Sequence, residues 1–472
     1  MTRYLLVPGR HHVFTAAQAH RLAAFSGMHV LFAITSANRA HARFNPIPFH
    51  VRAIGADRLA RAAGLDHRII GIPHYPPTDR FAKNTIQDVA EQTEGDVILT
   101  PDNCRVATNT AEVAAQYRAL GFEVVDVEGD GAPPVEVLAR LGAAGVDWAS
   151  DPALVAELCE ATRSVFEDFP EVPRRVGRLY TDPLLDDSGS LTETRNYAVY
   201  QTAMSNAAVI QMKYDDVKPH IADGKIVDEG CGDGALLVPI SREFRDADLI
   251  GLEISGEFMA QCLERQRRGD YGGTYTHFHQ RNLMERIFLP RSIDTTLCNS
   301  TLHELWSYGD GEATVHAYLA HKYEQTRPGG RLVIRDVVGP PDKHREVALW
   351  CDAKNRAKLE RFERDFLAAP IEIDWTRELP RLSLRDATEF LTKKDYDANW
   401  ASEMHETFCF WDVGEWSRAL EDAGFEVRTA ETYVNPWIVE NRWRGQVELR
   451  DPQTHEPLAW PPTTMILVGE RP

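Results

Sequence analysis

The sequence lacks the features that mark disulfide scaffolds, zinc ribbons and membrane-spanning proteins. Its 7 cysteines are scattered and form no Cys-x-x-Cys pair, so neither a disulfide framework nor a metal site is predicted. No apolar run approaches the roughly 20 residues that a spanning helix needs. The apolar stretch in the opening MTRYLLVPGRHH is too short for a signal peptide. We therefore expect a cytoplasmic protein with no membrane partner.

An excess of basic charge is also missing. The sequence has 52 Lys and Arg against 71 Asp and Glu, and its formal net charge is −19. A protein that binds nucleic acid needs a basic surface to neutralise phosphates. Here such a surface would have to be local, against an acidic background. The composition therefore argues against a nucleic-acid partner and favours a small molecule.

The chain has 472 residues, which favours two domains. Short predicted strands alternate with helices over 1–165 and again over 196–472, as βαβ units of parallel sheets do. The polar, proline-containing stretch 166–195 has the composition of a linker. Residues of about 340–415, rich in Trp, Glu and Arg, exceed what the second unit needs and are predicted to form a lid-like insertion. The predicted fold class is α/β, with two doubly wound Rossmann-like domains.

The stretch IVDEGCGDGALL carries the strongest local signal. Gly230, Gly232 and Gly234 lie where a predicted strand turns into a helix, and glycines there let the backbone approach a ligand. Their GxGxG spacing differs from the fingerprint of dinucleotide enzymes. Asp228 and Asp233 would repel a pyrophosphate, but they suit the cationic, phosphate-free methionyl end of S-adenosylmethionine.

Two further polar side chains follow the next predicted strands. Glu253 ends the strand LIGLEIS, where an acid can accept hydrogen bonds from ribose hydroxyls. Asn282 follows the strand-like THFH and is placed to bond an adenine amino group. Together with the glycines, these residues outline a nucleoside-binding site.

The order of these segments resembles class I S-adenosylmethionine-dependent methyltransferases over about 200–345, with a final strand pair further on. The resemblance implies a seven-stranded sheet, S-adenosylmethionine as the cofactor, and a contact from the helix that precedes the glycine loop. Where the family more often has Asp, this sequence has Asn282. The cofactor-binding residues implied are Asp228, Gly230, Cys231, Gly232, Asp233, Gly234, Glu253, Ile254, Asn282, Leu283, Asn299, Ser300 and Tyr197.

Methyl transfer needs an oriented acceptor and, for many acceptors, a base. His303 and Glu304 come just after the fourth predicted strand of the second unit, and His405 lies in the predicted insertion beside Glu406. His303, Glu304 and His405 are therefore the predicted catalytic residues. The aromatic side chains of the insertion favour an apolar acceptor pocket. The pattern leaves open whether N, O or C is methylated.

The first unit resembles a different family of enzymes. VPGRHHVFTAAQAHRL and ITSANRAHARFNPIPFHVRAIG are similar to the opening and the substrate loop of nicotinamide mononucleotide adenylyltransferases. The family's HxGH reads Thr15-Ala16-Ala17-Gln18 here, and its closing SGTxIR reads Pro134 to Ala139. The resemblance therefore implies a nucleotidyltransferase-like fold without that catalysis. Candidate ligand contacts are Asn38, Arg43, Asn45, Asp102 and Asn103.

The sequence predicts an S-adenosylmethionine-dependent methyltransferase of a small-molecule acceptor, in specialised metabolism. Its first domain would bind a ligand, position the acceptor or form a homodimer. One alternative is methylation of a tRNA or protein, with docking through the first domain. A basic face there would draw on Arg39, Arg43, Arg52, Arg58 and Arg61. The other alternative is a non-catalytic sensor of S-adenosylmethionine.

Overall fold

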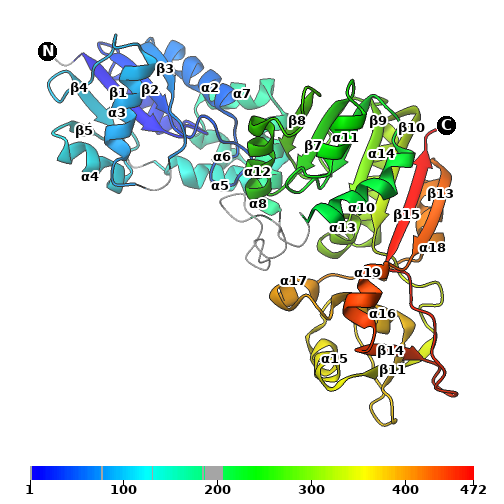
Figure 1. Ribbon diagram of the computed structural model, residues 1–472. Coiled ribbons are helices and arrows are strands. Elements are labelled where there is room, and N and C mark those ends of the chain that lie inside the picture. The colour runs from blue at the N-terminus through cyan, green and yellow to red at the C-terminus, as the bar shows by residue number, and fades with distance from the viewer. Residues whose placement is uncertain (1–2, 76–77, 130, 183–184, 186–205) are drawn as a thin grey trace. The chain divides into compact units, whose positions relative to one another are not determined.

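The computed structural model describes the chain apart from residues 1–2, 76–77, 130, 183–184 and 186–205. The chain divides into two compact units, Met1–Ser190 and Leu191–Pro472. Each is built on its own α/β sheet (Figure 1), which confirms the predicted fold class. No helix among the described residues is long and apolar enough to cross a membrane.

Unit 1 contains a five-stranded parallel sheet with the order β3-β2-β1-β4-β5. The central strands YLLVPG and HVLFAI are apolar almost throughout, as expected for parallel strands covered on both faces. The strands are β1 Tyr4–Gly9, β2 His29–Ile34, β3 Asp66–Gly71, β4 Cys104–Ala107 and β5 Glu123–Val125. The helices are α1 Ala16–Ala23, α2 Phe49–Ala62, α3 Phe81–Gln92, α4 Ala111–Ala119, α5 Pro134–Ala144, η1 Gly145–Ser150, α6 Pro152–Glu157, α7 Glu160–Asp168 and α8 Glu171–Thr181.

The structure differs from the predicted linker over its first part. Residues 166–181, which the sequence analysis assigns to the linker, include the end of α7 and all of α8. Val172, Val176 and Leu179 recur at helical spacing and are buried, and α8 packs against α5 and η1. Pro170 and Pro173, which contribute to the linker-like composition of this stretch, lie at the N-cap and in the first turn of α8, where proline is tolerated.

We expect Val176→Ala to destabilise unit 1, because this side chain is fully buried between helices. The loss should be about 1–3 kcal/mol in the free energy of unfolding, measured by urea denaturation. Arg174→Ala on the exposed side of the same helix is the matched control, and its effect should stay within about 0.5 kcal/mol. Equal effects of the two substitutions would mean that α8 is not part of the core of unit 1.

Unit 2 contains a seven-stranded sheet with the order β13-β15-β10-β9-β6-β7-β8. Only β15 runs antiparallel to its neighbours, β10 and β13. The strands are β6 Lys225–Glu229, β7 Asp248–Glu253, β8 Thr276–Gln280, β9 Ile293–Asn299, β10 Thr326–Asp336, β13 Glu426–Tyr433 and β15 Thr464–Glu470. The helices that belong to this sheet are α10 Ala207–Val217, η2 Lys218–His220, α11 Leu237–Glu243, α12 Gly256–Arg268, α13 Leu302–Tyr308, α14 Glu312–Gln325 and α18 Val413–Asp422.

The insertion is a small layer with its own three-stranded sheet, β12-β11-β14, and its own apolar core (Figure 1). It comes from two segments of the chain, one between β10 and α18 and one between β13 and β15. The second segment lies beyond the predicted 340–415, although its Trp443, Val447 and Leu449 are central to that core. Its elements are β11 Glu346–Cys351, α15 Ala353–Asp365, β12 Arg381–Ser383, α16 Leu384–Lys393, η3 Asp397–Asn399, α17 Trp400–Glu403, α19 Pro436–Ile438, η4 Val439–Trp443 and β14 Val447–Arg450.

Candidate functional site

The glycine loop joins β6 to α11 at the carboxyl edge of the sheet. The backbone N–H groups of Gly230 and Cys231 donate to the carbonyl of Leu252 in β7, at 2.9 and 3.0 Å. Gly230, Gly232 and Gly234 all have positive φ. A Cβ added to Gly230 or Gly234 would collide with neighbouring side chains, whereas one added to Gly232 would meet no atom within 4 Å. Gly232 therefore faces open space where a ligand can approach the backbone.

Glu253 lies beside that space, at the end of β7. Its Oε2 accepts the N–H of Gly232 at 2.9 Å, and its Oε1 accepts the N–H of Ser255 at 2.8 Å. Burial raises the pKa of Glu253 to about 7. A carboxylate accepts about four hydrogen bonds, so capacity remains for a ligand diol. This arrangement fits the ribose-binding role expected from the sequence.

The two aspartates of the loop have different surroundings. Asp228 is buried at the end of β6, and its burial raises the pKa of the carboxyl to about 7. Asp233 forms an ion pair with Arg265 of α12 at 2.5 Å and also accepts the N–H of Ala235. Asp233 thus anchors the loop to α12, whereas Asp228 lies buried in β6 just before the loop.

The other predicted cofactor residues gather at the same edge of the sheet. Ile254 follows β7, and its carbonyl accepts a hydrogen bond from the side chain of Gln280. Asn282 follows β8, and its Oδ1 accepts a hydrogen bond from the backbone N–H of Met284. Leu283 is buried beside it. The remaining described members are Cys231 in the glycine loop, Asn299 at the end of β9, and Ser300, which has a positive φ of 55°. Tyr197 lies outside the described residues.

Comparison with known proteins identifies this part of the chain. Residues 227–332 match the family model described as a methyltransferase domain. These residues are similar to a methyltransferase domain. The open face of Gly232 beside Glu253 leaves room for the nucleoside of S-adenosylmethionine, the cofactor expected from the sequence. No curated protein matches the chain.

Several solved structures resemble the chain at low identity. A geranyl diphosphate C-methyltransferase from Streptomyces coelicolor A3(2) is 12% identical with a TM-score of 0.33, and the match covers 56% of this chain and 77% of that one. A possible histamine N-methyltransferase from Thermotoga maritima is 14% identical with a TM-score of 0.33, covering 59% and 97%. An S-adenosylmethionine-dependent methyltransferase from Mesorhizobium loti is 16% identical with a TM-score of 0.35, covering 57% and 100%.

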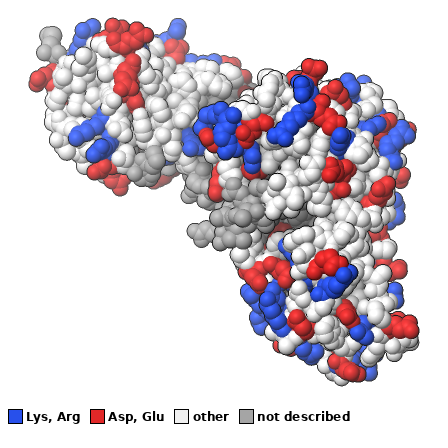
Figure 2. Space-filling model, in the orientation of Figure 1, with Lys and Arg blue, Asp and Glu red and all other residues white. Residues whose placement is uncertain are grey.

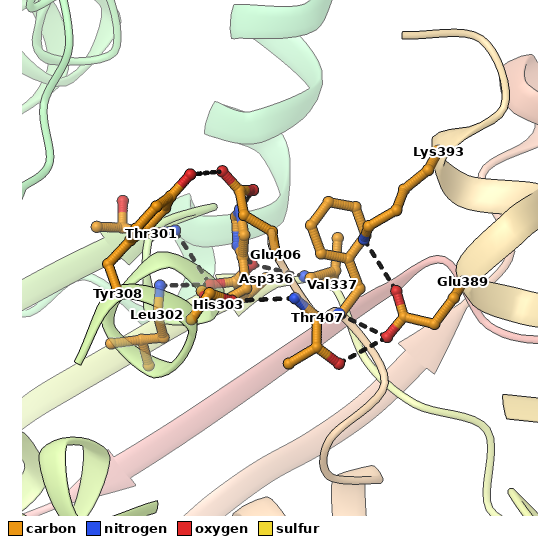
Figure 3. A network of polar contacts seen from close by, with 12 residues as sticks. Thr301, Leu302, His303, Tyr308, Asp336, Val337, Glu389, Lys393, Glu406 and Thr407 are labelled. Atoms are coloured by element: carbon orange, nitrogen blue, oxygen red, sulfur yellow. Dashed lines mark hydrogen bonds and ion pairs between the residues drawn. The ribbon is translucent and has the colours of Figure 1, made fainter. Parts of the chain in front are cut away.

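Next to the cofactor residues of the methyltransferase domain, His303 lies in the first turn of α13 between two carboxylates (Figure 3). Its Nδ1 is 2.7 Å from Oδ1 of Asp336, at the end of β10. Its Nε2 is 3.7 Å from Oε2 of Glu406, in the insertion. Burial alone would lower the pKa of His303, but the charge and hydrogen bond of Asp336, with Glu406, raise it to about 9.

Asp336 also fixes the backbone around this histidine. Its Oδ2 accepts the N–H groups of Thr301 and Leu302 at 3.0 and 2.7 Å, and its Oδ1 accepts that of Val337 at 2.7 Å. The first turn of a helix has unsatisfied N–H groups that favour a carboxylate. One side chain therefore holds the start of α13 and the orientation of the His303 ring.

The insertion supplies the other side of this network. Tyr308 donates to Oε1 of Glu406 at 3.0 Å. Glu389 of α16 accepts the backbone N–H groups of Phe408 and Cys409, each at 2.8 Å, and pairs with Lys393 at 2.9 Å (Figure 3). The residues after Glu406 are therefore pinned to α16. The ring of Phe408 packs edge-on against His303, at 4.9 Å between centroids.

The predicted catalytic residues separate in the structure. His303 is buried in the network, with 6% of its surface exposed. Glu304 is partly buried, and its charge contributes to raising the pKa of Glu253, so it lies toward the ribose acid. His405 is exposed and lies outside this buried network, so its predicted role on the acceptor stays a prediction. Its neighbour Glu406 is the buried residue of that pair.

In unit 1, the residues at the HxGH positions have a structural role. Thr15 is the N-cap of α1, and its side chain accepts the N–H of Gln18, whose own side chain accepts the N–H of Thr15. This reciprocal capping box engages both side chains. Four of the candidate ligand contacts also bond to the backbone, namely Asn38, Arg43, Asn45 and Asn103. These contacts give each of these side chains a structural role that needs no ligand.

The proposed basic face of unit 1 is largely engaged as well. Arg52 is buried and donates to three backbone carbonyls. Arg58 pairs with Asp168 and Arg61 with Asp57. On the described part of the face shown in Figure 2, basic and acidic side chains are interspersed. These arginines therefore do not form a continuous basic surface.

Gly232→Val should abolish cofactor binding, because a β-branched side chain would fill the open space beside Glu253 and strain a φ of 55°. Binding of S-adenosylhomocysteine by calorimetry measures this. Gly269→Val is the matched control, since Gly269 also has a positive φ and open surroundings but caps the far end of α12. Normal binding by the Gly232 variant would contradict the site assignment.

Proposed function

We propose that the chain is an S-adenosylmethionine-dependent methyltransferase that methylates an O–H or N–H group of a small-molecule acceptor. The observation that carries this proposal is His303, buried between Asp336 and Glu406 beside the predicted cofactor residues. A histidine oriented by a carboxylate is a suitable general base. Asp336 and Glu406 both stabilise the imidazolium that forms when the ring takes up a proton.

The roles of the residues follow from this arrangement. The glycine loop and Glu253 hold the cofactor, which when bound supplies an electrophilic methyl group. Nε2 of His303 accepts the proton that the acceptor atom loses on methylation. Asp336 keeps the Nδ1 proton in place, so that Nε2 is the nitrogen that exchanges a proton. Oε2 of Glu406 is 3.7 Å from Nε2 of His303. At this position the carboxylate of Glu406 would accept a hydrogen bond from the O–H or N–H group of the substrate that is methylated.

The enclosure of this histidine supports a small acceptor over a macromolecule. Glu406 and Phe408 come from the insertion and cover His303, which is 6% exposed. A base at such depth is accessible to a small molecule after a local movement of the insertion, but not to a folded polymer. The engagement of Arg52, Arg58 and Arg61 in unit 1 points the same way.

Methyl-labelled S-adenosylmethionine, incubated with the purified protein and a size-fractionated cell extract, tests the proposal. Label should appear in the small-molecule fraction and identify the acceptor. Label confined to nuclease- or protease-sensitive material would contradict a small acceptor. Binding of S-adenosylhomocysteine without transfer to any fraction would contradict the enzyme and favour a sensor.

With the acceptor identified, His303→Gln should lower kcat by about 100- to 10,000-fold, the usual contribution of a general base. The affinity for S-adenosylhomocysteine should change little, because His303 is not a predicted cofactor residue. His405→Gln is the matched control, since it makes the same change at an exposed neighbour of the network. Equal kcat values for the two variants would overturn the role of His303.

The pH dependence should follow the raised pKa of His303. Only the neutral ring can take up a proton, and a pKa of about 9 keeps most of it protonated at neutral pH. We therefore expect kcat/KM to rise about tenfold per pH unit below pH 9 and to level off above it. Asp336→Asn removes the main stabilising charge and should shift the rise to lower pH. A profile that is flat from pH 6 to 9 would contradict this mechanism.

A further inference from the structure

A buried lysine lies next to the glycine loop without a partner of its own. Lys213 is in α10 and is 9% exposed. Among the described residues, Lys213 forms no ion pair or hydrogen bond. The other buried lysines each contact a carboxylate, at 2.5 Å for Lys322 and Glu229 and at 2.9 Å for Lys393 and Glu389. Lys394 pairs with Asp395 at 2.9 Å.

The position of Lys213 is fixed by contacts one turn further along α10. Asp216 accepts Nε of Arg335 in β10 at 2.6 Å and the hydroxyl of Tyr433 in β13 at 2.7 Å. Residues three apart lie on the same side of a helix, so this clamp turns Lys213 toward the sheet. The helix is therefore held in register against the strands that carry the site.

The charges around Lys213 are those of the cofactor site. Burial, and then the charge of Arg335, lower its pKa to about 8, while Asp228, Asp336 and Asp233 act in the opposite direction. Asp228 is the penultimate residue of β6 and Asp336 the last of β10, and these two strands lie on either side of β9. Burying a charged ammonium group costs free energy unless an anion pairs with it.

The methionyl end of the cofactor is a zwitterion, with one carboxylate and one ammonium group. The site offers a buried acid, Asp228, and a buried base, Lys213, at the same edge of the sheet. We propose that Lys213 binds the α-carboxylate of S-adenosylmethionine and so positions the methionyl chain. The inference deepens the proposed function by assigning a cofactor-positioning residue that the glycine motif does not contain.

Two ligands that differ in the amino-acid group test this assignment. S-adenosylhomocysteine carries the carboxylate, whereas 5′-methylthioadenosine lacks the whole amino-acid moiety. Lys213→Met should weaken binding of S-adenosylhomocysteine about ten- to a hundredfold, as loss of a charge-assisted hydrogen bond predicts. Its affinity for 5′-methylthioadenosine should stay within about twofold of the wild type, and Lys213→Arg should recover part of the lost affinity.

Lys218→Met is the matched control, because it removes the same charge from a more exposed position just after α10. It should leave both affinities unchanged. Equal weakening of both ligands by Lys213→Met would show a structural role and overturn the proposal, as would unchanged binding of S-adenosylhomocysteine. Failure of the wild type to bind S-adenosylhomocysteine would instead contradict the proposed function itself.

Discussion

The carboxylate of Asp336 is the interaction on which the acceptor side of the methyltransferase domain depends. It is buried and accepts hydrogen bonds from three backbone N–H groups and from the ring of His303. A buried carboxylate is stable only with such a set of donors. Because these donors come from the start of α13 and the end of β10, the same side chain joins a strand end, a helix start and the candidate base. Its pKa is lowered, since these hydrogen bonds and the charge of His303 outweigh its burial.

The insertion completes the site through a second buried acid. Glu389 accepts the backbone of Phe408 and Cys409 and is neutralised by Lys393, which also lies over the ring of Phe408. Removal of one partner of such a pair leaves an uncompensated buried charge. The pair therefore fixes the segment that brings Glu406 to His303. The candidate cofactor residues belong to the seven-stranded sheet, and the network around His303 is shared with the insertion.

The sequence predicted what depends on local pattern. Strands β6, β7, β9, β10 and β15 lie on largely apolar stretches of the sequence. The glycine loop follows β6, and Glu253 ends β7. Glu406 and Lys213 were missed as site residues because their roles come from contacts distant in the sequence. His405 was preferred to Glu406 for its chemistry alone, but the turn after α17 exposes one and buries the other. Asp336 carried a usable signal, since it ends the strand RLVIRD as Glu253 ends its own.

The fold of unit 1 was also predictable from its alternating strands and helices. The residue at which its last helix, α8, ends was not. The polar composition of 166–181 favoured a linker, although its valines recur at helical spacing and are buried. Likewise, the stretch DVILTPD at 96–102 has the apolar composition of a strand but forms none, and β4 begins only at Cys104. Pro101 has no N–H to pair, and Asn103 closes a turn by accepting the N–H of Thr100. The apolar residues before that turn have the pattern of a strand although they do not belong to one.

The central claim is that Asp336 and Glu406 hold His303 as an imidazolium at neutral pH. Nitrogen-15 NMR of histidine-labelled protein measures this directly, with His303→Gln used to assign the resonance. The account predicts that both ring nitrogens of His303 stay protonated until the pH approaches 9. Titration of His303 near the ordinary histidine pKa of about 6.5 would contradict the account, because the two carboxylates would then not stabilise the charged ring.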